Sequence, residues 1–153
     1  MEQLLQVEQG IEDSIRGLSI LIADDDQDLI AVLKVRCENM GLHVTAVEDA
    51  LTALSCADLG LPDLVILDVE MPGGNGLAAC EMLATDKKFA NVPLLILTGR
   101  KDEETIRRCH SLGATYVHKS PAAWSKLEPL IRTKLLAAIG SESGSDTRLL
   151  TTQ

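Results

Sequence analysis

Acidic side chains stand directly after two short apolar segments of the chain, 20–23 and 64–67. Asp24 and Asp25 follow the first segment, and Asp68 follows the second. Two carboxylates about 5 Å apart repel each other by roughly 3 kcal/mol at an effective dielectric constant of 20. Such a cluster favours a hard divalent cation, and carboxylate and water ligands suit Mg²⁺. We therefore expect a magnesium site at Asp24, Asp25 and Asp68.

A hydroxyl group and an ammonium group follow two further apolar segments. Thr98 comes directly after the segment 94–97, and Lys119 comes shortly after a fifth apolar segment. A bound cation would neutralise an incoming phosphoryl group, while Thr98 and Lys119 would hold its remaining oxygens and Gly99 would leave room for it. Asp68 is then a candidate nucleophile that forms an aspartyl phosphate.

The elements that must position these groups alternate along the chain. The apolar segments are mostly continuous, which is typical of parallel strands buried on both faces. Segments of helical periodicity lie between them, so the pattern predicts five strand–helix units with helices on both faces of one sheet. The carboxyl ends of such strands share one edge of the sheet, where working residues gather. The expected strands are 20–23, 44–47, 64–67, 94–97 and 116–117, and the expected helices are about 29–40, 51–58, 76–87, 102–112 and 127–138.

The two ends of the chain fall outside this pattern. Residues 1–17 carry apolar side chains at helical spacing and form an N-terminal extension that suits a short helix. The globular domain is expected over 18–139. Residues 140–153 are rich in Ser, Gly and Thr, which predicts a flexible C-terminal tail. Pro129 is expected in the first turn of the last helix, with 121–126 forming a separate short turn.

Composition excludes several classes of protein. The 153 residues include 14 Lys+Arg and 23 Asp+Glu, a formal net charge of −9, and aromatic residues make up 2%. An acidic chain poor in aromatic residues is badly suited to direct nucleic-acid binding. No apolar run approaches the ~18 residues of a membrane span, and no signal peptide is evident, so we expect a cytoplasmic protein with no membrane contact. Four widely spaced cysteines without metal-binding spacing are expected to be reduced thiols.

Four segments together resemble the receiver domain of two-component response regulators. They are ILIADDD at 20–26, DLVILDVEMPGGNG at 63–76, LILTG at 95–99 and GATYVHK at 113–119. The resemblance covers about 17–139, in which these segments keep the order and spacing of the family. It implies a flavodoxin-like α/β fold, a three-layer sandwich around a parallel five-stranded sheet of order 2-1-3-4-5.

The resemblance also implies roles for the acidic residues. Asp68 would be phosphorylated from the phosphohistidine of a sensor histidine kinase or a histidine phosphotransfer protein. Asp25, Asp68 and the backbone carbonyl of Glu70 would ligate Mg²⁺ directly, and Asp24 would act through water.

A switch follows from the same resemblance. Lys119 would pair with the phosphoryl group, Thr98 would move to hydrogen-bond it, and Tyr116 would follow Thr98 inward. These movements would remodel the surface of the fourth helix, the fifth strand and the fifth helix, where an unknown downstream protein is expected to bind.

Two features of this chain concern the surroundings of these residues. Ser120 follows Lys119 where the family usually has Pro, so we expect a trans Lys119–Ser120 bond, because a cis bond costs ~3 kcal/mol without Pro. In the family that the chain resembles, the residues two positions after the acceptor Asp and after the switch Thr flank the path of the hydrolytic water. In this chain these residues are Glu70 and Arg100. We hypothesise that this oppositely charged pair slows self-dephosphorylation.

The favoured function is a stand-alone receiver, a binding module that catalyses only its own phosphorylation and dephosphorylation. No output domain fits in the roughly 14 residues after the last helix. The alternative is a Mg²⁺-dependent aspartate-nucleophile phosphatase or phosphotransferase, although that class has a second Asp where this chain has Glu70. A flavin or nucleotide binder of the same fold would need a Gly-rich loop after the first strand, which is missing.

Overall fold

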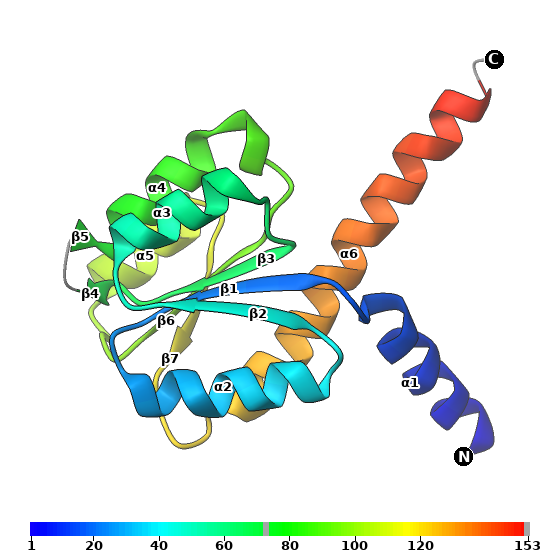
Figure 1. Cartoon of the computed structure of the whole chain (residues 1–153), viewed down its shortest axis with the longest axis horizontal. Coiled ribbons are helices and arrows are strands. Elements are labelled where there is room, and N and C mark those ends of the chain that lie inside the picture. Colours follow the sequence, from blue (N-terminus) through cyan, green and yellow to red (C-terminus); the bar gives the residue numbers. More distant parts are fainter. Residues whose placement is uncertain (72–73, 152–153) are drawn as a thin grey trace.

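A parallel five-stranded sheet forms the centre of the protein, in a computed structural model that describes residues 1–71 and 74–151, with side chains described for 1–71 and 76–140. Figure 1 shows the sheet between two layers of helices. Its strand order, β2-β1-β3-β6-β7, is the 2-1-3-4-5 order that the resemblance to receiver domains implies. The elements are α1 (Glu2–Ile15), β1 (Ser19–Ala23), α2 (Gln27–Asn39), β2 (His43–Val47), α3 (Ala50–Leu59), β3 (Leu64–Leu67), β4 (Glu70–Met71), β5 (Gly74–Asn75), α4 (Gly76–Thr85), a 3-10 turn (Lys87–Phe89), β6 (Leu94–Thr98), α5 (Glu103–Ser111), β7 (Thr115–His118) and α6 (Ala123–Thr151).

The sheet buries a separate hydrophobic core on each face. Helices α3, α4 and α5 cover one face, and their small residues, including Ala53 and Cys80, pack on it closely. Helices α2 and α6 cover the other face, where Leu127 and Leu135 of α6 are buried. The central strands are apolar on both sides because both faces are covered, which confirms the interpretation of the continuous apolar segments.

Aspartate side chains cap the N-termini of three of the helices. Asp26, Asp49 and Asp102 each accept a hydrogen bond from the backbone N–H three residues ahead, at 3.1, 2.7 and 3.0 Å. These bonds satisfy N–H groups that a helix leaves without an internal partner. Asp26 is therefore a capping residue of α2.

Helix α4 starts against the backbone of the loop that follows β3. A Cβ atom added at Gly76 would lie 1.7 Å from the carbonyl oxygen of Asp68. Glycine is thus needed at this position for close approach, and it fixes the start of α4 beside the candidate phosphoacceptor.

Helix α6 differs from the sequence prediction at both ends. It begins at Ala123, so Pro129 lies inside its second turn, and the separate short turn predicted over 121–126 is wrong. Proline inside a helix costs about 3 kcal/mol. Leu127 and Ile131, on either side of Pro129, are fully buried, and burial contributes about 1.5–3 kcal/mol for each side chain. Packing on the sheet thus outweighs the cost of the proline.

The C-terminal tail is also helical where it is described. The sequence predicts a flexible tail over 140–153; the backbone of α6 continues to Thr151, and the flexibility of this segment stays a prediction. No proline follows Pro129 to end the helix, and polar composition alone lowers helix stability without stopping it. Residues 152–153 lie outside the described part of the chain.

The sequence predicts no membrane span and no disulfide bond. Within the residues that the structure describes, no helix is long and apolar enough to cross a membrane. All four cysteines are free thiols, as predicted.

Candidate functional site

Neighbouring strands bring the candidate acidic residues together. In the pairing of β1 with β3, Ala23 lies beside Leu67, so the residues that follow them meet at the carboxyl edge of the sheet. The backbone N–H of Asp68 donates to the carbonyl of Ala23 at 3.0 Å. Carboxylate oxygens of Asp24, Asp25 and Asp68 all lie within 4.8 Å of one another. The expected cluster is therefore present.

The two buried carboxylates are held in fixed orientations. The Asp24 and Asp68 side chains are 3% and 5% exposed, whereas Asp25 is exposed to solvent. One oxygen of Asp24 accepts from the N–H of Asp26 at 2.9 Å, and one oxygen of Asp68 accepts from the N–H of Glu70 at 3.1 Å. The second oxygen of each carboxylate is left to face Lys119.

Lys119 bridges these two carboxylates. Its Nζ atom lies 2.7 Å from Oδ2 of Asp24 and 2.7 Å from Oδ2 of Asp68. Burial raises the pKa of Asp24, and the hydrogen bond from Lys119 offsets this only in part. Burial by itself would lower the pKa of Lys119, but its hydrogen bonds to Asp24 and Asp68 outweigh that effect and raise it. Lys119 is therefore charged and binds both carboxylates.

Strand pairing places Lys119 despite the unusual residue that follows it. Thr98 of β6 lies beside His118 of β7, and the N–H of Lys119 donates to the Thr98 carbonyl at 2.8 Å. No cis peptide bond occurs in the described chain, so the Lys119–Ser120 bond is trans, as predicted.

The three carboxylates are a suitable donor set for Mg²⁺. They supply hard oxygen ligands from two strand ends, as this ion requires. Their charge, together with that of Lys119, is −3 + 1 = −2 when all are ionised. A divalent cation would balance this charge.

The backbone of Arg100 links the two expected switch residues. Thr98 is fully buried, and its Oγ1 accepts a hydrogen bond from the N–H of Arg100 at 3.3 Å. Tyr116 is half-buried, and its hydroxyl donates to the carbonyl of Arg100. In this structure the Tyr116 hydroxyl therefore lies outside the core, at the loop that follows β6.

The Arg100 side chain lies between two carboxylates. Its Nε atom is 3.9 Å from Oε1 of Glu70 and 3.1 Å from Oδ1 of Asp102. Hydrogen bonds from Thr105 are the main reason why the pKa of Asp102 falls to about 2, and Arg100 lowers it further. The pairing of Arg100 with Glu70 was predicted from the sequence, whereas the contact with Asp102 was missed. The spacing of two residues from Arg100 was the available signal.

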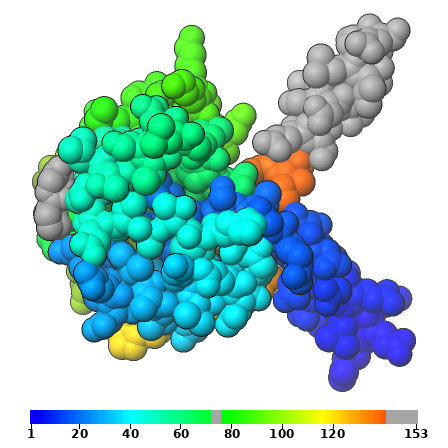
Figure 2. All heavy atoms as spheres, viewed as in Figure 1, coloured from blue at the N-terminus to red at the C-terminus, as the bar shows by residue number. Residues whose placement is uncertain are grey.

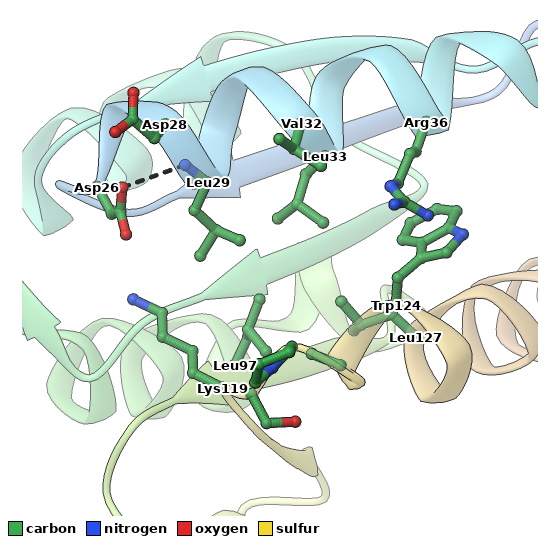
Figure 3. Close-up of a pocket in the computed structure, with 13 residues that line it drawn as sticks. Asp26, Asp28, Leu29, Val32, Leu33, Arg36, Leu97, Lys119, Trp124 and Leu127 are labelled. Carbon is green, nitrogen blue, oxygen red and sulfur yellow. Dashed lines mark hydrogen bonds between the residues drawn. The ribbon is translucent and has the colours of Figure 1, made fainter.

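A groove beside the site was also missed. It has a volume of about 500 Å³ and lies between α2 and the start of α6, with Lys119 among its lining residues (Figure 3). Leu29 and Leu33 contribute its apolar wall, and Arg36 lies over the Trp124 ring, 5.2 Å from its centre. The apolar groove thus begins next to the carboxylate cluster.

Comparison with known proteins decides the family. The model of the response regulator receiver domain matches residues 20–131, which is most of the chain. The chain belongs to this family. The receiver is similar to the alkaline phosphatase synthesis transcriptional regulatory protein PhoP of Bacillus subtilis, with 31% identity over 83% of this chain and 54% of PhoP. It is 30% identical to the DNA-binding response regulator MtrA of Mycobacterium tuberculosis over 76% of this chain and 50% of MtrA. The receiver thus spans about half the length of these curated relatives.

Solved structures agree with the fold. A CheY-like receiver domain protein of Methanospirillum hungatei aligns with a TM-score of 0.75, covering 82% of this chain and 98% of its own at 24% identity. The response regulator TrrA of Thermotoga maritima, solved in complex with Mg²⁺ and BeF, aligns with a TM-score of 0.68 at 27% identity, covering 76% of this chain and 98% of its own. The flavodoxin-like α/β prediction is confirmed.

Proposed function

We propose that this receiver accepts a phosphoryl group from a phosphohistidine onto Asp68. The observation that carries the proposal is the juxtaposition of Asp24, Asp25 and Asp68 within 4.8 Å, with Lys119 bound to two of them. The donor would be a sensor histidine kinase or a histidine phosphotransfer protein. A cytoplasmic location is part of the same proposal.

The proposed reaction uses groups already in place. An Asp68 carboxylate oxygen attacks the phosphorus atom as the phosphorus–nitrogen bond of the donor breaks, and the histidine nitrogen takes the bonding electrons. Asp25, Asp68 and the Glu70 carbonyl would hold Mg²⁺, and Asp24 would contact it through water; the bound ion would supply positive charge that neutralises the phosphoryl group. Lys119 exchanges its contact with Asp68 for a phosphoryl oxygen.

The hydrogen bonds of Arg100 suggest how the signal leaves the site. If Thr98 turns its hydroxyl toward the phosphoryl group, it gives up the bond from the Arg100 N–H. The Arg100 backbone then loses its hydrogen bond to Thr98, while the Arg100 carbonyl is still the acceptor for the Tyr116 hydroxyl. We infer that Tyr116 moves inward with Thr98, changing the surface of α5, β7 and α6 for a downstream protein. The acidic charge of the receiver disfavours direct nucleic-acid binding by this surface.

The lifetime of the phosphorylated state is proposed to depend on Glu70 and Arg100. Their side chains approach to 3.9 Å, a closed arrangement of the charged pair. The ion pair is exposed, so it contributes only ~0–1 kcal/mol. Since about 1.4 kcal/mol changes a rate tenfold, a contribution in this range can change the rate of dephosphorylation severalfold. Asp102 competes for the same guanidinium and weakens the closed arrangement. Decay of phosphoprotein should be severalfold faster in the Glu70→Ala/Arg100→Ala variant, and unchanged decay would contradict shielding.

The test of the main proposal is phosphorylation by acetyl phosphate with Mg²⁺, followed by intact mass. Wild type should gain one phosphoryl group, and Asp68→Asn should gain none while keeping its circular dichroism spectrum. Asp58→Asn, which alters an exposed carboxylate on α3, is the matched control and should label normally. Labelling of Asp68→Asn at the wild-type rate would place the acceptor elsewhere.

The phosphatase alternative is not favoured. The Glu70 carboxylate, which stands where that class has its second Asp, is 66% exposed and lies against Arg100. We expect no sustained turnover of phosphate esters beyond the self-catalysed phosphorylation and dephosphorylation of Asp68.

A further inference from the structure

Helix α1 carries an apolar stripe that is covered at one end only. Ile15 is fully buried in the core beneath α6, and Ile11, one turn earlier, is half-buried. Leu4 continues the stripe, but its side chain is 65% exposed, and Val7 beside it is 60% exposed. Figure 2 shows this half of α1, in dark blue, projecting from the body of the molecule. The projecting stripe covers no other part of the described chain.

The stripe is flanked by negative charge. Helix α1 contains four carboxylates and no lysine or arginine. It forms a cavity of about 310 Å³ with α6, lined by Glu8, Ile11, Glu12, Glu128 and Arg132. Arg132 is already paired with Glu12 at 3.7 Å and with Glu128 at 3.1 Å. The cavity therefore has an apolar floor at Ile11 and a net charge of −3 + 1 = −2.

We propose that this surface, formed by α1 and the Glu128–Arg132 turn of α6, is a docking site for a basic amphipathic helix of a partner protein. Apolar side chains of the partner pack on Leu4 and Val7, and its lysines or arginines face Glu8 and the other carboxylates. The 14-residue helix α1 offers a face about 21 Å long, enough for three to four turns of a partner helix.

Charge argues against the other occupants of such a face. A second copy would bring another α1 with four carboxylates and no cation, and like charges at close range repel. An anionic membrane surface would repel the helix for the same reason. A cationic partner helix satisfies the apolar stripe and the carboxylates together.

This docking surface is independent of the proposed phosphorylation site. Helix α1 leads into the start of β1, whereas Asp24 follows the end of β1. The two surfaces therefore lie at opposite edges of the sheet, and loss of one leaves the other intact.

The probe is a fluorescein-labelled 18-residue helix of leucine and lysine, with leucine at heptad spacing. Its binding to the whole chain is followed by fluorescence anisotropy at low salt, beside a leucine–glutamate peptide of the same pattern. We expect the lysine peptide to bind and the glutamate peptide not to bind. Leu4→Ser/Val7→Ser should weaken binding at least about tenfold, because the docked face loses two apolar contacts. Glu2→Gln/Glu8→Gln should weaken it about threefold at low salt, and high salt should abolish this difference.

Matched variants separate docking from general attraction to an acidic protein. Leu51→Ser/Leu59→Ser removes two leucines of α3 that are 67% and 90% exposed, and Glu103→Gln/Glu104→Gln removes two carboxylates of α5. Both should bind the lysine peptide as wild type does, and so should Asp68→Asn. Equal affinity in the α1 variants and these controls would overturn the proposal. The proposal would also be overturned if light scattering showed a wild-type dimer that the Leu4→Ser/Val7→Ser substitutions dissociate. Binding of the wild-type protein to anionic vesicles would overturn it as well.

Discussion

Replacement of Lys119 by Met removes the ammonium group that bridges Asp24 and Asp68 and keeps a side chain of similar length. The substitution leaves two buried carboxylates facing each other without their shared cation. With Asp25, the charge of the cluster changes from −2 to −3. We expect the variant to fold with lower stability in the absence of Mg²⁺.

The expected loss of stability can be estimated from the distances between the charged groups. The carboxylate oxygens lie within 4.8 Å of each other, and two unit charges at that limit repel by about 3.5 kcal/mol at an effective dielectric constant of 20. Removal of one partner of a buried ion pair costs about 3–5 kcal/mol. The Lys119 side chain is 23% exposed, so water screens part of this, and we expect about 2–3 kcal/mol. A chain of this size would then melt about 4–12 °C lower.

Low pH should reduce the difference in stability between the variant and wild type. The pKa of Asp24 is raised in the folded protein, mainly by burial, and the hydrogen bond from Lys119 holds it down in part. Loss of Lys119 raises this pKa further, while the unfolded value stays near 3.8. The folded variant therefore takes up a proton at higher pH than wild type does, which stabilises it increasingly as pH falls from 7 toward 4.

Mg²⁺ should also reduce this difference in stability, because it supplies positive charge in place of the missing ammonium group. A ligand that binds only the folded state stabilises it by RT ln(1 + [L]/Kd), so tighter binding to the variant appears as a larger gain in melting temperature. Thermal melts at pH 5 and 7, each with and without Mg²⁺, measure both effects, and Lys126→Met on the exposed face of α6 is the matched control. A loss that is equal at both pH values and unchanged by Mg²⁺ would refute the charge-balance reasoning and leave Lys119 as a packing residue.

Three further substitutions test other parts of the molecule. Asp25→Ala should weaken Mg²⁺ binding in calorimetry and leave the stability of the metal-free protein unchanged or higher, because it removes an exposed charge from a repulsive cluster; unchanged Mg²⁺ affinity would exclude Asp25 as a ligand. Thr98→Ala should still accept a phosphoryl group but lose the phosphorylation-dependent NMR shifts of α5 and β7, and shifts identical to wild type would refute the coupling through Arg100. Gly10→Ala should raise the free energy of unfolding by about 0.5–1 kcal/mol in denaturant titrations, since the added methyl group meets open space inside a helix. No gain would show that α1 unfolds separately from the rest of the chain.

The sheet and its acidic edge could be predicted from the sequence because one physical cause dominates there. Strands buried on both faces must be continuously apolar, so the runs before Asp24, Asp68 and Thr98 mark the strands to within one residue. Parallel pairing then brings the ends of these strands together at one edge. The side-chain cluster follows from topology, without any long-range contact having to be guessed.

The features that could not be predicted from the sequence depend on competing effects. The start of α6 is a balance between the cost of Pro129 and the burial of Leu127 and Ile131 on either side of it, and local sequence signals show only the cost. The two-residue ladder of β4 and β5 is too short to have a periodicity. Arg100 has two carboxylates within reach, and the choice between Glu70 and Asp102 depends on geometry that spacing alone does not give.

Lys119 shows why an unusual neighbour need not displace a functional group. The residue after it is Ser120 instead of the proline typical of the family, yet its ammonium group lies 2.7 Å from both carboxylates. Its position is determined from the preceding strand, because β7 pairs with β6 up to His118 and the Lys119 N–H continues the ladder to the Thr98 carbonyl. The peptide bond that follows affects mainly the path into α6 and the adjoining apolar groove. Each chemical group of the site is placed by the strand that precedes it, so the loops beyond can vary while the charges stay together.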